Sequence, residues 1–207
     1  MGSDPTLTGP VPETPSGGNA VMRGTDGVLR CGWVGQLPIY ITYHDDEWGR
    51  PRHGETALFE RLSLEAFQSG LSWLTILRKR ANFRAAFAGF DIDAVAALDD
   101  ADVERLMLDA GIVRNRAKIV TTIANARAIR TNVDDLDALL WSFAPAERGR
   151  RATLADAPTA SPESVAMAKE LRRHGVRFVG PTTAYALMQA TGMVDDHVAS
   201  CWRASTG

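Results

Sequence analysis

Apolar residues recur at intervals of three and four along most of this chain after residue 28. Such spacing places side chains on one face of an α-helix, whereas a half-buried strand needs strict alternation, which no stretch here sustains. The clearest pattern covers residues 56–69, where the apolar positions are Leu58, Phe59, Leu62 and Ala66. The sequence therefore predicts an all-α fold.

Capping and turn residues divide this pattern into segments. Ser161 followed by Pro162 is a typical helix start, because the hydroxyl caps free backbone N–H groups and proline fits the first helical position. Gly175 then marks the end of that helix. We expect helices over residues 56–69, 73–87, 91–98, 100–109, 116–130, 161–175 and 181–192, and a last helix that carries His197 and Cys201.

The first part of the chain differs from the rest in composition. Residues 1–28 are rich in Gly, Pro, Ser and Thr and contain few large apolar side chains. Such a segment cannot bury enough apolar surface to offset the conformational entropy that it loses on ordering. We therefore expect a disordered tail over residues 1–28 and one helical domain over residues 29–207.

The overall balance of charge and hydropathy narrows the class of protein. No apolar run approaches the roughly 18 residues that a membrane-spanning helix needs, and the first residues lack the layout of a secretory signal. We therefore expect no membrane span and a location in the cytosol, where we expect a monomer. The formal net charge of −2 argues against a protein that coats nucleic acid non-specifically.

Basic residues nevertheless gather in three places, over residues 78–84, 114–118 and 172–177. Each cluster could contact phosphates, and such contacts supply most non-specific DNA affinity. Solvated helix ends would produce the same clusters. Charge alone therefore leaves both interpretations open.

Two cysteines and two histidines are candidate metal ligands from opposite ends of the chain. Without an export signal, free thiols or metal ligands are more expected than a disulfide between Cys31 and Cys201. On a helix, His197 and Cys201 would point the same way, and His44 follows Cys31 closely in sequence. Two thiolates and two imidazoles suit a tetrahedral zinc with no open position, which would be structural. The alternative is a pair of buried apolar thiols beside a hydrogen-bonded histidine.

A single carboxylate lies among aromatic residues. On a helical wheel Glu65 falls at the margin of the apolar stripe, where an acid is costly unless it is paired or faces a pocket. The nearby aromatic residues are Trp33, Tyr40, Tyr43, Trp48 and Trp73. An acid with aromatic rings can hold a flat cationic ligand by charge pairing and cation–π attraction. Alternatively, the rings belong to the core and Glu65 pairs with Arg61 or another base.

A short connection joins the last two long helical segments. It runs from Arg177 to Thr182 and contains Gly180 and Pro181. A tight turn followed by a helix start presents free backbone N–H groups, which can bind a DNA phosphate. Many helix pairs are joined in this way for packing alone, so the connection is a weak indication by itself.

Several strings of residues occur here in a specific order. They are Arg30–Trp33, Tyr40–Gly49, Glu65, Gln68–Trp73, Asp109–Ile112, Phe178–Gly180 and Asp196–His197. In this order the chain resembles the 3-methyladenine DNA glycosylase I family, within the helix-hairpin-helix glycosylase superfamily. The strings His-Asp-x-Glu-Trp-Gly and Gly-Leu-Ser-Trp are highly specific together. The resemblance covers about residues 30–201.

The resemblance implies a role for each candidate residue. The zinc ligands would be Cys31, His44, His197 and Cys201, with one structural zinc per chain. Glu65 would be the acid that reads the extruded base, and the aromatic cage around it would consist of Trp33, Tyr40, Tyr43 and Trp73. The connection around Gly180 would hold the phosphate backbone of double-stranded alkylated DNA. One departure lies at Thr182, where the superfamily hairpin has a second glycine, so the detailed phosphate contacts stay open.

The implied reaction is hydrolysis of the N-glycosidic bond of 3-methyladenine in a nucleotide swung out of the duplex. No lysine is placed to form a Schiff base with the sugar, so a monofunctional glycosylase is expected. A non-enzymatic DNA-binding module would not need Glu65 with its aromatic set. A catalytic zinc hydrolase would need an open coordination position, which four protein ligands would not leave.

Asp195 is the least settled residue near the candidate site. Many helix-hairpin-helix glycosylases have an essential aspartate in a Val-Asp-x-His segment, and this chain has Val194-Asp195-Asp196-His197. The family that the chain resembles often has asparagine there. We expect Asp195 or Asp196 to cap the final helix by accepting backbone N–H bonds. A role in stabilising the sugar cation is the alternative.

Overall fold

The computed structural model describes residues 21–146 and 151–204, which form a mainly helical protein. Its α-helices are α1 (Pro38–Asp46), α2 (Glu55–Gln68), α3 (Trp73–Ala86), α4 (Ile92–Ala97), α5 (Asp100–Leu108), α6 (Arg116–Asn132), α7 (Leu136–Trp141), α8 (Pro162–Arg173) and α9 (Pro181–Ala190). Short 3₁₀ turns cover Gly32–Val34, Ala88–Phe90 and Leu154–Asp156. Within the described ranges, no helix has both the length and the apolar character that crossing a membrane requires.

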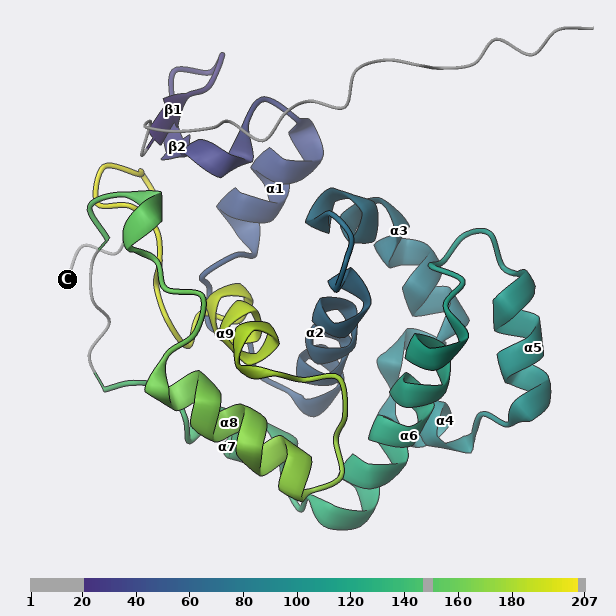
Figure 1. Cartoon of the computed structure of the whole chain (residues 1–207). Coiled ribbons are helices and arrows are strands. Elements are labelled where there is room, and N and C mark those ends of the chain that lie inside the picture. Colours follow the sequence, from purple (N-terminus) through teal and green to yellow (C-terminus); the bar gives the residue numbers. More distant parts are fainter. Residues whose placement is uncertain (1–20, 147–150, 205–207) are drawn as a thin grey trace, which may run out of the picture.

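Helix α2 is central to the packing. It contacts α3, α6 and α9, and it lies beside α9 near the middle of the molecule (Figure 1). Five phenylalanines from α2, α3 and the turn after α3 are completely buried: Phe59, Phe67, Phe83, Phe87 and Phe90. Burying each such side chain contributes roughly 1.5–3 kcal/mol, so this cluster fixes the position of α2.

Side-chain caps begin several of the helices that the spacing predicted. Asp91 accepts the backbone N–H of Ala94 at the start of α4, and Asn115 does the same for Lys118 in α6. Ser161 forms a reciprocal capping box with Ser164 ahead of α8. The helices predicted between residues 56 and 192 are therefore confirmed, with ends that differ by a few residues.

Two helices were not predicted from the sequence. Helix α1 contains a run of β-branched and aromatic residues, which have low intrinsic helix propensity, and no side chain caps its start. It is stabilised instead by packing, because Tyr43 and His44 are buried. Helix α7 has only six residues, too few for a visible period.

The all-α prediction omitted a small antiparallel hairpin. Strand β1 (Val21–Arg23) pairs with β2 (Leu29–Cys31), with Met22 opposite Arg30. The predicted tail over residues 1–28 therefore includes one strand of this hairpin, and residues 1–20 lie outside the described residues. The hairpin leads directly into Cys31 and so positions the first candidate metal ligand.

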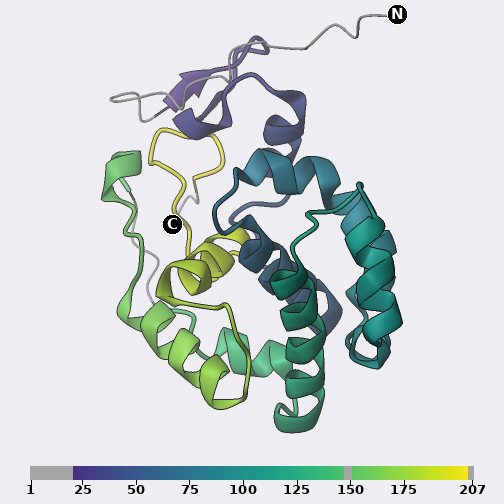
Figure 2. The same cartoon turned by 45° about the vertical axis from the view of Figure 1, so that its right-hand side comes forward.

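The last predicted helix is wrong. After α9 the chain contains turns and a strand-like bridge between Val198 and Arg151, with the Ala199 N–H donating to the Arg151 carbonyl at 2.8 Å. Because the Ala199 N–H bonds to another segment and the Cys201 N–H bonds to the Val198 carbonyl three residues back, residues 195–201 do not form the continuous bonds of an α-helix. The segment passes from α9 to the N-terminal hairpin (Figure 2), where the Trp202 N–H donates to the Leu29 carbonyl at 2.9 Å.

Candidate functional site

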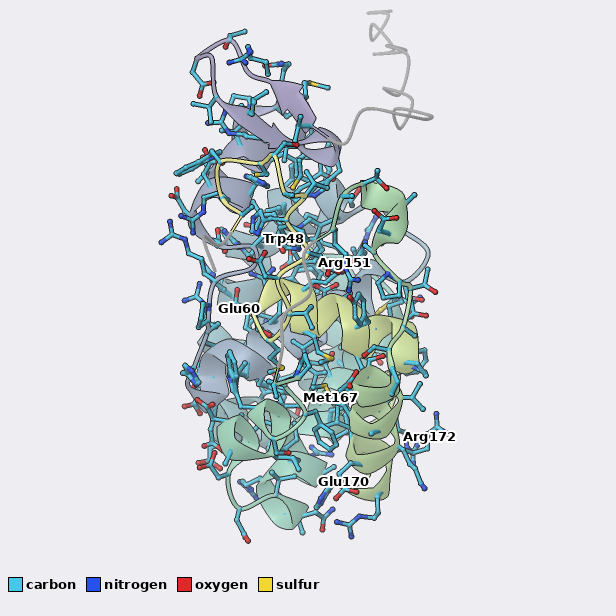
Figure 3. The ribbon with its side chains drawn as sticks, turned by 90° about the vertical axis from the view of Figure 1, so that its left-hand side faces the viewer. Trp48, Glu60, Arg151, Met167, Glu170 and Arg172 are labelled. Carbon is cyan, nitrogen blue, oxygen red and sulfur yellow. The ribbon has the colours of Figure 1, made fainter. Side chains whose placement is uncertain are left out.

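A cavity of about 350 Å³ opens between α2, α9 and the N-terminal part of the chain. Its lining residues come from both ends of the chain: Trp33, Tyr43, Trp48, Glu65, Gln68, Trp73, Ala157, Ala186, Gln189, Ala190 and Asp196. Trp48 lies toward the hairpin end of the molecule, whereas Arg172 of α8 lies toward the opposite end (Figure 3). A volume of this size accommodates one small, flat ligand.

Aromatic rings form much of the cavity wall. Trp33 packs edge-on against Trp48 with ring centroids 5.2 Å apart, and Tyr43 tilts against Trp73 at 5.5 Å. Edge-to-face packing of this kind holds the rings in fixed orientations. Tyr40, which the sequence placed in this cage, is not among the lining residues. Its ring packs edge-on against Trp33 at 5.7 Å.

Glu65 brings a carboxyl group into this aromatic surrounding. It lies in the middle of α2 and is only 6% exposed. Within the described ranges its carboxylate has neither a hydrogen bond nor an ion pair, so the pairing with Arg61 that the sequence allowed is not observed. Burial raises the pKa of Glu65 to about 7, partly offset by the charge of Arg61. The site therefore contains an acid whose oxygens are available to a ligand.

Asp196 is a second buried carboxylate at the cavity, but its oxygens are engaged. The Tyr185 hydroxyl donates to it at 2.7 Å, Gln189 Nε2 at 2.8 Å and Arg151 Nε at 2.9 Å. The bond from Arg151 also holds the segment that contributes Ala157 to the cavity wall. Asp196 is therefore suited to fixing the shape of the cavity.

Trp73 contributes an unused hydrogen-bond donor. Its indole Nε1 is buried and has no partner in the part of the chain that the structure describes. Buried donors rarely stay unsatisfied, so this N–H is an exception among the described residues.

The set of base-binding residues implied by the resemblance leaves out three polar or aromatic lining residues: Trp48, Gln68 and Asp196. Of these, Trp48 is among the aromatic residues noted near Glu65 in the sequence. Trp48 and Gln68 both lie inside the strings that carry the family resemblance, which was the available signal. Asp196 also belongs to one of these strings, but the role considered for it was that of a helix cap, which depended on a last helix that does not form.

A second cluster joins the two ends of the chain. Ligand atoms of Cys31, His44 and Cys201 all lie within 4.8 Å of one another, and all three side chains are buried. Both thiols are free, and His44 Nε2 lies 3.4 Å from Cys201 Sγ. The thiol of Cys31 and the nearby His44 lower the pKa of the Cys201 thiol, which favours a thiolate there. These three residues form a group that can bind a metal ion.

His197 is next to this group without belonging to it. Its ring lies 4.9 Å from that of His44, and its buried Nε2 has no hydrogen-bond partner among the described residues. Gly49 makes this position possible, since a Cβ there would meet His197 Cε1 at 2.5 Å. His197 Nδ1 lies 2.7 Å from Asp195 Oδ1, which also accepts the His197 backbone N–H at 3.1 Å. Asp195 thus accepts a backbone bond as expected, but in a turn and not at a helix start.

A shallow hollow lies at the connection between α8 and α9. Its lining includes Arg172, Arg177 and Gly180, and neither arginine side chain forms an ion pair within the described part of the chain. No side chain caps the start of α9, so its first backbone N–H groups are free. The left-handed residue here is Phe178, with φ of 61°, whereas Thr182 lies inside α9. The helix itself therefore does not require a second glycine at position 182.

Comparisons with known proteins identify the family that the chain matches. A family model described as methyladenine glycosylase matches residues 33–204. The chain is 48% identical over 177 residues to DNA-3-methyladenine glycosylase 1 of Escherichia coli (strain K12), which covers 83% of this chain and 95% of that protein.

Solved structures give the same result for the fold. A crystal structure of 3-methyladenine DNA glycosylase I matches with a TM-score of 0.81 at 45% identity, covering 85% of this chain and 100% of that chain. The Staphylococcus aureus 3-methyladenine DNA glycosylase I matches with a TM-score of 0.78 at 31% identity, covering 83% and 94%. The chain therefore belongs to the methyladenine glycosylase family.

Proposed function

We propose that this glycosylase removes N3-methylated adenine from a nucleotide that has swung out of double-stranded DNA into the cavity. The observation that carries the proposal is Glu65, a buried carboxylate without a bonding partner in the described ranges, facing an aromatic cavity. An anion among aromatic faces favours a flat cation over a neutral base of the same shape. The names of the similar proteins, which refer to 3-methyladenine, support the same substrate.

The chemistry follows from the charge of the substrate. Methylation at N3 leaves the adenine ring cationic while it is attached to the sugar. When the glycosidic bond breaks, its electron pair moves to the base, which leaves neutral. A water oxygen then bonds to C1′ of the sugar and loses a proton to solvent. Because the leaving group is already good, Glu65 contributes chiefly by selecting and holding the charged base.

We propose that the reaction ends with base release and includes no strand cleavage. A lyase step needs an amine that can attack C1′ of the sugar. The chain has three lysines, at positions 79, 118 and 169, and none of them lines the cavity. Lys79 and Lys118 instead donate to backbone carbonyls elsewhere, at 2.7 Å to Ala110 and 2.5 Å to Ser69.

The hollow between α8 and α9 is our candidate for the DNA backbone contact. Arg172 and Arg177 supply positive charge, and the free N–H groups at the start of α9 supply donors for a phosphate oxygen. A Cβ at Gly180 would meet no protein atom within 4 Å, so a backbone could approach closely there.

We propose a structural zinc held by Cys31, His44, Cys201 and His197. The unsatisfied Nε2 of His197 supplies a fourth donor beside the three-residue group. Both imidazoles have a carboxylate at Nδ1, from Asp45 and Asp195, which is the usual way to orient a zinc-binding histidine through its other nitrogen. Zinc would cross-link the N-terminal and C-terminal segments that together form one wall of the cavity.

Chromatography of the bases released from methylated DNA tests the catalytic proposal. The unmodified protein should release 3-methyladenine, and Glu65→Gln should do so about ten- to a hundred-fold more slowly, since a charge-assisted bond contributes roughly 1.5–3 kcal/mol. Glu104→Gln is the matched control, because Glu104 is exposed on α5 and pairs with Arg116. Release by Glu65→Gln at the parental rate would show that the cavity is not the reading site. Absence of release by the unmodified protein would leave a DNA-binding module.

A further inference from the structure

Arg61 lies behind the aromatic wall of the cavity. It belongs to α2, is 7% exposed, and does not line the cavity itself. Its guanidinium carbon lies 5.2 Å from the ring centroid of Tyr43 and 5.3 Å from that of Trp73. Its Nη1 also donates to the Tyr43 hydroxyl at 3.2 Å. One cation therefore contacts both rings that flank Glu65.

A buried arginine needs an anion to compensate its charge. The anion that contacts Arg61 is Glu47, which also binds a second arginine. Glu47 lies 3.4 Å from Arg61 Nη2, but both of its oxygens accept from Arg80, at 2.5 and 2.7 Å. The closer pair is thus Glu47 with Arg80. Much of the Arg61 charge is left to act on the next carboxylate along the helix, Glu65, one turn further on.

Resting on the proposed function, we propose that Arg61 is a positioning residue, which fixes Tyr43 and Trp73 from behind and supplies a counter-charge for Glu65 without occupying its oxygens. A direct ion pair would also stabilise the Glu65 anion. It would, however, take the oxygens that must bind the base. A cation that acts through space, anchored by two rings and a hydroxyl, avoids this competition.

The charges around Glu65 set the sign of the expected pH effect. Burial raises the pKa of Glu65 to about 7 and Arg61 lowers it. The other ionisable groups near the cavity are Tyr43 and Glu47 from the α1 side, Arg80 from α3, and Asp196 after α9. Removing Arg61 removes the cation that lowers the Glu65 pKa, so this pKa rises. The anion needed for base binding then forms only at higher pH.

Single-turnover excision of 3-methyladenine, measured from about pH 6 to about pH 9 with uncatalysed release subtracted, tests this role. For Arg61→Met we expect the midpoint of the pH profile to move up by about one unit, which is about a five-fold loss at pH 7 and about a ten-fold loss at pH 6. At high pH this loss should shrink to the loss caused by the missing contact with Tyr43. Arg61→Lys keeps the charge and should keep the midpoint while lowering the rate, because the fork that contacts Tyr43 is lost. Arg105→Met, which removes an exposed arginine of α5, is the control.

The outcomes separate the two proposals. If Glu65→Gln excises at the parental rate, the proposed function fails, whatever Arg61 does. If Glu65→Gln is slow but Arg61→Met keeps the parental midpoint, only the role of Arg61 fails. A shift in Arg61→Lys as large as that in Arg61→Met would also overturn it, because the charge would then be irrelevant. Should Arg61→Met not fold, Arg61→Gln, which can still bond the Tyr43 hydroxyl, should show the same alkaline shift, and its absence would be equally decisive.

Discussion

Glu65 lies in a buried environment that disfavours its ionised form. This environment explains how one side chain could select a cationic base. A neutral adenine in the cavity would leave the buried anion with only the through-space compensation of Arg61. A methylated, cationic adenine would supply a positive charge beside the Glu65 carboxylate. Its binding would therefore be stabilised by an electrostatic attraction that a neutral base does not provide. Selection by charge requires that no protein group already bonds the carboxylate, and none does within the described residues.

Asp195 orients His197, and we predict that zinc content depends on this contact. Elemental analysis should find about one zinc per unmodified chain. Asp195→Asn should keep it, because the amide oxygen can still accept from His197 Nδ1. Asp195→Ala should lower zinc affinity by roughly 10–100-fold, which is typical when the group that orients a ligand is removed.

Excision measured on the same Asp195 samples distinguishes the alternative role. A loss of activity beyond about a hundred-fold in Asp195→Asn with zinc retained, or roughly 2.7 kcal/mol of barrier, would place Asp195 in the chemistry of the sugar cation. An unchanged zinc affinity in Asp195→Ala, measured by competition with a chelator, would instead contradict the orienting role.

The sequence predicted the residue types at the site better than their placement. Glu65, Trp33, Tyr43 and Trp73 do meet at the cavity, whereas Trp48 takes the place expected for Tyr40. Both are aromatic residues that precede Glu65 in the chain, and neither position alone shows which ring faces the cavity. Which ring turns inward depends on how α1 packs, and α1 itself has no period that the sequence reveals.

Among the elements, the connection before α9 combines an uncapped helix start with open space. Gly180 has φ of −89° and ψ of 175°, an extended conformation that alanine also adopts. We therefore predict that Gly180→Ala changes the free energy of unfolding by less than about 0.5 kcal/mol. DNA affinity, measured by fluorescence anisotropy on an abasic duplex, should nevertheless fall, because the added methyl group occupies space that a phosphate would need.

The matched control for Gly180→Ala is Ala101→Gly on α5, which is exposed and remote from the hollow. If Gly180→Ala binds the duplex as tightly as the unmodified protein at equal salt concentration, the hollow is not the backbone contact. A large loss of stability would instead show that the glycine serves the fold.

The ends of a helix could be predicted from the sequence where a nearby side chain caps them. They could not be predicted where backbone hydrogen bonds to a distant segment determine the structure. Asp91 and Ser161 indicate the starts of α4 and α8 in the sequence, because a helix cap is a local interaction. The non-helical path of residues 195–201 depends on Arg151, more than forty positions earlier in the chain. Helical spacing of His197 and Cys201 could not reveal this bridge, although both residues still arrive beside His44.

At the scale of the whole molecule, the site is assembled from segments that are far apart in sequence. Its lining residues come mainly from the turn after the hairpin and the α1 region, from α2 and α3, and from α9 with the segment that follows it. The proposed zinc cluster joins the first of these segments to the last. Burying the Glu65 carboxylate is unfavourable for the free energy of folding. Such a fold can hold Glu65 there because the packing of the whole helical core offsets this unfavourable contribution.

That cost should be measurable as a dependence of stability on pH. The pKa of Glu65 is raised from 4.5 to about 7 in the folded protein, so the folded state binds the proton more tightly than the unfolded chain does. The stabilising effect of the protonated form is complete below the unfolded pKa and is lost as pH rises toward 7. Glu65→Gln removes this titration. Its stability relative to the unmodified protein should therefore increase from about pH 5 to about pH 8, by on the order of 2–3 kcal/mol.

Urea unfolding of the DNA-free protein at both pH values measures this difference. Any constant effect of the glutamine amide, such as an unsatisfied N–H, cancels when the two pH values are compared, and so do the titrations of all other groups that the two proteins share. Glu104→Gln should show no such gain, because Glu104 is exposed and its pKa is lowered by the bond from Arg116. If the stability difference between Glu65→Gln and the unmodified protein is the same at both pH values, Glu65 is well solvated. The proposed selection of a cationic base would then lose its physical basis, because it requires Glu65 to be buried and poorly solvated.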